Sequence, residues 1–108
     1  MPSPATRRAV LALTIAAALA HGRAVPAAPP PGETLAQRWC AQCHALKPGQ
    51  PSPDPTAPGF ADITAEPSAT ELSLRVFLRT PHPTMPNFRL QADEIDDLVG
   101  YILSLKRR

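Results

Sequence analysis

The chain has 108 residues and a mass of 11.5 kDa, which allows one domain at most. Its fifteen prolines and five aromatic residues leave little material for a protein core, so a bound apolar group would have to supply part of the centre. The formal net charge of +2 falls to zero if Arg7 and Arg8 are removed with a leader, and we therefore expect no nucleic acid partner.

The N-terminal residues have the pattern of a secretory signal peptide. Arg7 and Arg8 precede an apolar run over residues 9–20, which ends in the small-X-small cleavage pattern Ala-Leu-Ala. The run is shorter than the ~20 residues that a membrane-spanning helix needs, so an uncleaved anchor is the alternative and not our prediction. We expect a signal peptide at 1–20 and a flexible leader rich in proline and alanine at 21–31.

A short helix is predicted over residues 33–39, directly before the only two cysteines of the chain. Leu35, Trp39 and Cys43 are spaced four apart and share one face of it. Trp39 either fills core volume or lies on the surface, and the spacing leaves both interpretations open.

The motif Cys40-Ala41-Gln42-Cys43-His44 predicts covalent attachment of c-type haem. Each thiol can add across one vinyl group of the haem, and the histidine that follows can bind the iron. Two alternatives fit less well. A thioredoxin-like dithiol would follow a strand in a βαβ pattern, and no upstream segment predicts a strand. A structural zinc site would need a second ligand pair, and downstream only His82 is available.

The segment over residues 47–59 contains five prolines and no hydrophobic period, so we expect a loop that wraps around the centre. Phe60 and Ile63 follow it, apolar and three residues apart. We expect both to line the haem pocket or the helix beneath it.

A helix is predicted over about residues 69–79, opened by a capping box of Ser68 and Glu71. Its apolar residues spread over two neighbouring stripes, a pattern typical of a helix covered by both haem and protein. We expect core packing for all five of them, Leu72, Leu74, Val76, Phe77 and Leu78.

Three prolines between Pro81 and Pro86 end this helix and hold a rigid, extended loop that presents Met85. A thioether is a soft ligand for iron, and Met85 is the only methionine left once the signal peptide is removed, so we predict it as the sixth ligand. The alternatives are that Met85 is a core residue or that His82 binds the iron instead. We otherwise expect His82 at the surface or near a haem propionate, and Phe88 as a pocket wall.

The last helix begins at about residue 91 and has the clearest periodicity of the chain. Acidic residues in its first turn and the basic residues that close the chain complement the helix dipole. Gly100 inside the helix suggests close approach of another backbone or a tolerated substitution. The apolar positions repeat at i, i+3, i+4, i+7 and i+8, namely Ile95, Leu98, Val99, Ile102 and Leu103.

The cysteine motif, Met85 and the amphipathic C-terminal segment together resemble a small bacterial class I cytochrome c of the monohaem family, over roughly residues 32–105. The resemblance implies an all-α fold of about three helices with long Pro-rich loops, wrapped around one covalently bound haem c with its iron. The cytochrome c domain would span 32–108. The cofactor-binding residues that the resemblance implies are Cys40, Cys43, His44 and Met85, of which His44 and Met85 would hold the metal.

Two structural expectations come from the resemblance alone. Relatives pack the helix before the motif across the C-terminal helix, where Gly32 takes the family's small position and Leu98 and Tyr101 would lie at the crossing. Ala36 stands where relatives often have an aromatic residue, which is a departure from the pattern. In relatives a proline carbonyl also accepts the N–H of the iron-bound imidazole, and Pro58 is the candidate among the five prolines of the loop over residues 47–59, with a purely rigidifying role as the alternative.

With both axial positions filled, the iron has no open site, and we expect an electron carrier and not an enzyme, with no catalytic residues and no small-molecule substrate. We expect a monomer in the periplasm, where redox protein partners dock transiently at the exposed haem edge. Two alternatives stay open. The chain could be the haem-bearing subunit of a larger dehydrogenase or oxidase complex, or a gas- or peroxide-binding protein in which Met85 is labile.

Overall fold

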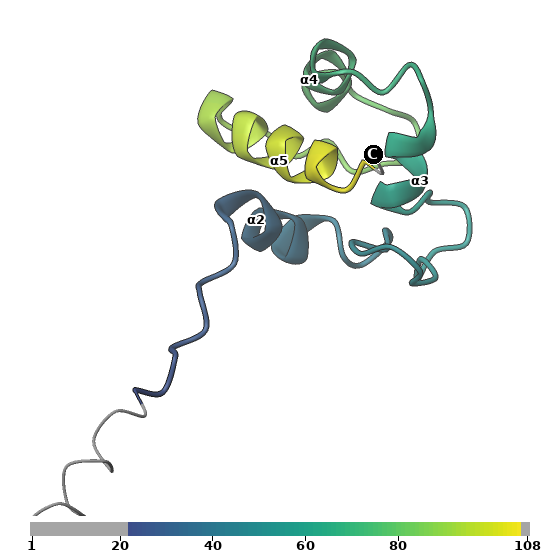
Figure 1. Ribbon diagram of the computed structural model, residues 1–108. Helices are drawn as coiled ribbons and strands as arrows, with labels where there is room; N and C mark the ends of the chain where they lie inside the picture. The colour runs from purple at the N-terminus through teal and green to yellow at the C-terminus, as the bar shows by residue number, and fades with distance from the viewer. Residues whose placement is uncertain (1–21, 107–108) are drawn as a thin grey trace, which may run out of the picture.

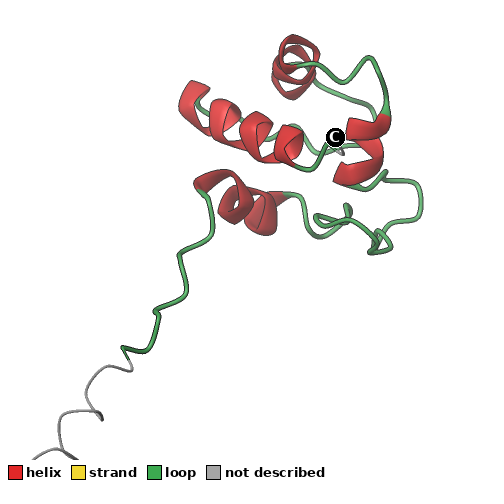
Figure 2. Ribbon diagram, viewed as in Figure 1, coloured by secondary structure: helices red, strands yellow, loops and turns green. Residues whose placement is uncertain are grey.

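The computed structural model describes residues 22–106, and within this range it contains helices and no strand (Figure 2). The expected all-α fold is therefore confirmed. The predicted signal peptide and the basic residues Arg107 and Arg108 lie outside the described range. Every described helix is too short or too polar to cross a membrane. The helices are α2 (Pro31–Trp39), α3 (Phe60–Ala65), α4 (Glu71–Arg79) and α5 (Ala92–Ser104).

The centre of the fold is the crossing of α2 and α5, which lie side by side in Figure 1. Gly32 makes this approach possible, because a Cβ atom placed on it would lie 2.0 Å from the carbonyl oxygen of Asp97. Ala36, one turn later, is completely buried, and Leu98 is 2% exposed. The Tyr101 hydroxyl donates to the carbonyl of Leu46 at 3.0 Å, which fastens α5 to the segment after the cysteine motif. The crossing implied by the resemblance is present.

The apolar face of α5 follows the predicted period closely. Ile95, Val99 and Ile102 are buried in the core, and the Glu94 carboxylate accepts a hydrogen bond from the backbone N–H of Gln91 at 2.8 Å, which caps the first turn. The close approach suggested for Gly100 is wrong, since Gly100 is exposed and a Cβ atom there would meet nothing within 4 Å.

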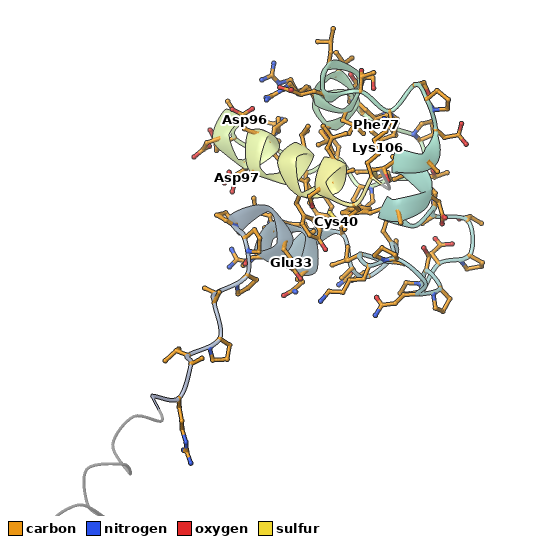
Figure 3. All side chains as sticks on the ribbon, viewed as in Figure 1. Glu33, Cys40, Phe77, Asp96, Asp97 and Lys106 are labelled. Carbon is orange, nitrogen blue, oxygen red and sulfur yellow. The ribbon has the colours of Figure 1, made fainter. Side chains whose placement is uncertain are left out.

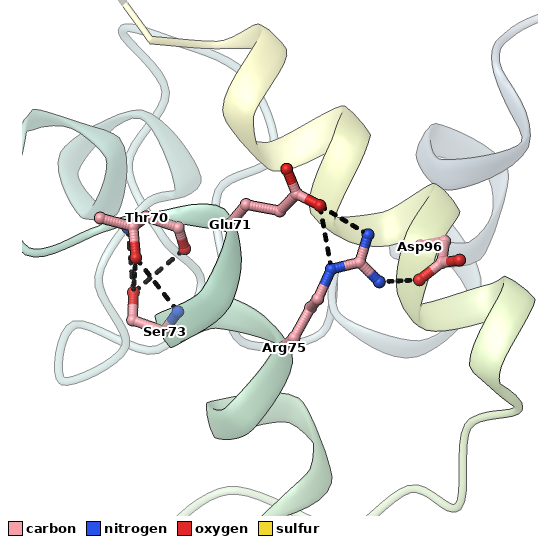
Figure 4. A network of polar contacts seen from close by, with 5 residues as sticks. All are labelled: Thr70, Glu71, Ser73, Arg75 and Asp96. Atoms are coloured by element: carbon pink, nitrogen blue, oxygen red, sulfur yellow. Dashed lines mark hydrogen bonds and ion pairs between the residues drawn. The ribbon is translucent and has the colours of Figure 1, made fainter.

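The start of α4 differs from the prediction. Thr70, and not Ser68, is the N-cap residue: its hydroxyl accepts the N–H of Ser73 at 3.1 Å, and the Ser73 hydroxyl accepts the N–H of Thr70 at 2.9 Å (Figure 4). Residues 66–69 instead form a turn closed by the Ala69 N–H on the Glu66 carbonyl at 3.0 Å. The fixed backbone of Pro67 and the burial of Ala69 favour this turn over an earlier helix start.

A charged link joins α4 to α5. The Arg75 guanidinium contacts Glu71 at 2.8 Å on its own helix and Asp96 on α5 (Figure 4). Glu71, predicted as the capping partner of Ser68, therefore serves as an ion-pair partner. Because both carboxylates are largely exposed, we assign this link an orienting role and little net stability.

Core packing is confirmed for Leu74, which is 8% exposed, and in part for Leu78, which packs against the core. It is wrong for Leu72 and Val76, which are 72% and 57% exposed, and for Phe77, which is 46% exposed. A helix of nine residues that meets α5 along one side cannot bury a stripe on its other side.

Candidate functional site

The cysteine motif lies in a helical turn that continues directly from α2. The N–H of Cys40 donates to the carbonyl of Ala36 at 2.8 Å, and the carbonyl of Cys40 accepts the N–H groups of Cys43 and His44 at 3.1 and 2.9 Å. This turn places both thiols on the end of α2, where they are half-buried and not joined in a disulfide. Figure 3 shows Cys40 at this end of the helix.

The environment of Cys40 argues against thiol–disulfide chemistry. Cys40 packs against the hydrophobic core, and this burial raises the pKa of its thiol to about 11. A redox-active or nucleophilic cysteine requires a lowered pKa, so that the thiolate is available at neutral pH. Cys40 has the opposite perturbation, which disfavours the dithiol alternative.

His44 is held in one orientation and one tautomer. Its Nδ1 atom lies 2.7 Å from the carbonyl oxygen of Pro58. A proline carbonyl can only accept a hydrogen bond, so Nδ1 carries the proton and Nε2 keeps its lone pair. The imidazole ring also lies 5.6 Å from the ring of Phe60, measured between centroids. His44 is therefore prepared to bind a metal through Nε2, and the predicted contact with Pro58 is present.

Met85 lines an apolar pocket between α2, α4 and the segment over residues 80–90. Cys40 lines the same pocket, which brings one thiol and the thioether to a common site; Cys43 and His44 are not among its lining residues. His82 lines the pocket as well and stacks on Phe77 with 3.5 Å between ring centroids. Both candidates for the sixth ligand therefore lie at this site.

Aromatic and aliphatic side chains make up most of the pocket wall. Phe88 belongs to it as predicted, and its ring lies 5.1 Å from that of Trp39, which also lines the pocket although it is 41% exposed. Leu35 on α2, Leu90 and Phe77 also belong to the wall. Leu90 was not predicted, and the only sequence signal for it is its position two residues after Phe88 in an extended segment.

The donor set fits a covalently attached haem. Two free thiols on one turn can form thioethers, an imidazole nitrogen and a thioether sulfur are known axial ligands of haem iron, and the apolar wall suits a macrocycle. Within residues 22–106, no group of three or more His, Cys, Asp or Glu side chains is placed to hold a metal ion.

Comparison with known proteins gives two matches. The family model described as cytochrome c oxidase, cbb3-type, subunit III matches residues 27–102, a span that includes the cysteine motif and Met85. Cytochrome c-552 of Bradyrhizobium diazoefficiens is 38% identical over 96 residues, which cover 89% of this chain and 92% of that protein. No solved structure matches significantly.

Proposed function

This chain belongs to the cytochrome c family, and on that basis we propose that it is a periplasmic carrier that shuttles single electrons between redox protein partners. Members of this family contain covalently bound haem c and act as electron-transfer proteins that are generally not enzymes. Beyond this general family role, we propose a compartment for the protein, a role as a free carrier and the residues that bind the haem.

Haem c supplies an iron that gains and loses one electron. We propose that Cys40 and Cys43 hold the haem through thioether bonds and that His44 and Met85 occupy its two axial positions. The hydrogen bond of 2.7 Å between His44 and Pro58 carries this proposal. It fixes the ring, leaves Nε2 free for iron and makes the imidazole more electron-rich, while the apolar pocket places a soft thioether nearby.

Met85 is preferred to His82 because of what each side chain contacts. His82 is held against α4 by stacking on the Phe77 ring. Met85 is half-buried in the pocket wall, between prolines that hold the segment extended. A His/Met pair also gives a higher reduction potential than a pair of histidines, as suits a carrier between donor and acceptor proteins.

The chain organisation belongs to the same proposal. Residues 1–20 would be a signal peptide removed on export, residues 21–31 a leader, and residues 32–108 the haem domain. In support, residues 22–30 are exposed and outside any helix, and export to the periplasm is typical of the family. We propose that the domain is a monomer whose partners dock transiently at the haem edge.

A second function is favoured by one observation, since the matching family model is named for a subunit of an oxidase. The chain would then be a haem-bearing subunit of a larger complex. Purification of the chain from its native membranes and periplasm separates the two cases. A carrier is recovered alone in the soluble fraction, and a subunit is recovered with its complex.

The ligand assignment is tested by absorption spectra of the oxidised and reduced protein, produced with periplasmic haem maturation. We expect a c-type spectrum with a weak band at about 700 nm from methionine bound to ferric iron. Met85→Ala should abolish this band, and the matched variant His82→Ala should keep it. A c-type spectrum without the band in the wild type would indicate His82 ligation or an open site, and a spectral change of the reduced protein with carbon monoxide would identify the open site. Absence of covalent haem would refute the proposal.

A further inference from the structure

The loop over residues 52–60 is fastened to the cysteine motif along its whole length. Because this loop has no helix or strand of its own before α3, these contacts determine where its carbonyl groups lie. A Cβ atom on Gly59 would lie 3.5 Å from the Cβ of Ala45, an ordinary van der Waals distance, so the loop packs against the residue that follows the motif. The hydrogen bonds that join the loop to the motif and to Ala45, the residue after it, are Asp54 N–H to Cys43 O at 3.2 Å, Ala45 N–H to Ser52 Oγ at 3.0 Å, Phe60 N–H to Ala45 O at 2.9 Å and His44 Nδ1–H to Pro58 O at 2.7 Å.

Asp54 organises the turn that leads to Pro58. Its carboxylate oxygen Oδ1 accepts both the backbone N–H of Thr56 at 2.9 Å and the Thr56 hydroxyl at 2.7 Å. Its backbone carbonyl accepts the N–H of Ala57 at 3.1 Å. This is an Asx-type turn, in which a side chain takes over the role of a backbone acceptor. The turn determines the direction in which the chain reaches Pro58, two residues after Thr56.

Asp54 is also a fixed negative charge beside His44. The hydrogen bonds from Thr56, first from its side chain and then from its backbone, lower the pKa of Asp54. The carboxylate is therefore ionised at neutral pH. Asp54 lies beside the residue that precedes His44, because its backbone N–H donates to the carbonyl of Cys43 at 3.2 Å. A negative charge near a redox centre stabilises the more positive, oxidised state.

We propose that Asp54 is a positioning residue for His44. The turn formed by Asp54 holds the Pro58 carbonyl on the His44 Nδ1 atom, and the Asp54 charge lowers the reduction potential of the iron. This inference rests on the proposed function, because it requires His44 to be an iron ligand. Asp54 is not one of the proposed ligands, and it acts through the loop and through its charge.

The two effects are separable by substitution. Asp54→Asn keeps the Oδ1 acceptor and removes the charge, whereas Asp54→Ala removes both. Glu66→Gln is the control for loss of one surface charge, because Glu66 is exposed and, among the described residues, its side chain makes no hydrogen bond or ion pair. The measurements are the midpoint potential of the haem protein and the solvent exchange rate of the His44 Nδ1–H, followed by NMR in the reduced state.

We expect Asp54→Asn to shift the ratio of reduced to oxidised protein at a fixed ambient potential about threefold toward reduced, the size of a partly screened interaction between nearby charges. This is a rise of about 30 mV, since a tenfold change in a one-electron couple is about 59 mV. Glu66→Gln should shift the midpoint potential less than Asp54→Asn does. Exchange of the Nδ1–H should be unchanged in Asp54→Asn and at least several-fold faster in Asp54→Ala.

An Asp54→Asn potential that changes no more than that of Glu66→Gln would overturn the charge effect. Unchanged exchange in Asp54→Ala would overturn the positioning effect. Both results count against this inference alone when the wild-type protein shows the band at about 700 nm. Absence of that band in the wild type would overturn the proposed ligands, and this inference with them.

Discussion

Replacing Gly32 with alanine should force α2 and α5 apart. The added Cβ would lie 2.0 Å from the carbonyl oxygen of Asp97, 2.6 Å from its carbonyl carbon and 2.8 Å from the Cβ of Tyr101. The first two are backbone atoms, which cannot rotate away, so one helix must move. Overpacking of this kind costs typically about 1–3 kcal/mol, and we expect the upper end of that range because the crossing is the core of the domain. For a domain of this size, each kcal/mol lowers the Tm by about 4–8 °C.

The matched control is Gly100→Ala on the exposed face of α5. A Cβ atom there meets nothing within 4 Å, so alanine should stabilise the helix by up to about 1 kcal/mol through its higher helix propensity. Thermal unfolding of the oxidised haem protein, followed by far-UV circular dichroism, measures both variants. The reasoning is refuted if Gly32→Ala unfolds at the wild-type temperature or if Gly100→Ala loses as much stability as Gly32→Ala.

Three further substitutions test the helix cap, the charged link and the buried phenol. Thr70→Ala removes the N-cap of α4 and should lower the free energy of unfolding by about 1 kcal/mol in urea titrations, and an unchanged midpoint would contradict the assigned cap. Arg75→Met should cost less than about 1 kcal/mol, and the loss should shrink at high salt; a loss independent of salt would mean that packing, not charge, is responsible. Tyr101→Phe should cost about 1 kcal/mol at neutral pH, because a buried carbonyl loses its donor. Burial, and then the negative charge of Glu33, raise the pKa of Tyr101 above its ordinary value of 10.0. The neutral phenol therefore contributes fully to the free energy of unfolding below that pH, and this contribution is lost as the pH rises through the pKa of the folded state. The stability difference between wild type and Tyr101→Phe should therefore narrow in alkaline solution, and a constant difference would exclude the phenol as the cause.

Two kinds of helix feature were predictable from the sequence: a regular apolar pattern repeated over several turns, and a helix end marked by prolines. The five apolar positions of α5 and the prolines after Arg79 each carry a local signal that tertiary contacts reinforce. The six-residue helix α3 was not predictable, because it is shorter than two turns and shows no full amphipathic period. Packing stabilises it, since Phe60 is 4% exposed and its ring lies near those of His44 and Tyr101.

Local sequence patterns did not determine the start of α4 or which apolar residues of α4 are buried. Ser68 with Glu71 and Thr70 with Ser73 both have the spacing of a capping box, and the turn at Pro67 decides between them. Leu72 and Val76 are apolar, but apolarity does not reveal whether a neighbour covers them. Conversely, Pro58 was one of five prolines in the loop that could have contacted His44. Its contact is present because hydrogen bonds fasten the loop both before and after Pro58.

The crossing of α2 and α5 joins an early segment of the chain to a late one, and this has a consequence for biosynthesis. α2 is synthesised before the core residues on α5, so a chain in which α5 has not yet been made or exported offers α2 no such partner to pack against. During that interval Cys40 is free of the contacts that bury it and raise its pKa to about 11 in the folded chain. Attachment at Cys40, as proposed, is therefore chemically favoured before the C-terminal helix docks, while the thiol is not yet buried against the core.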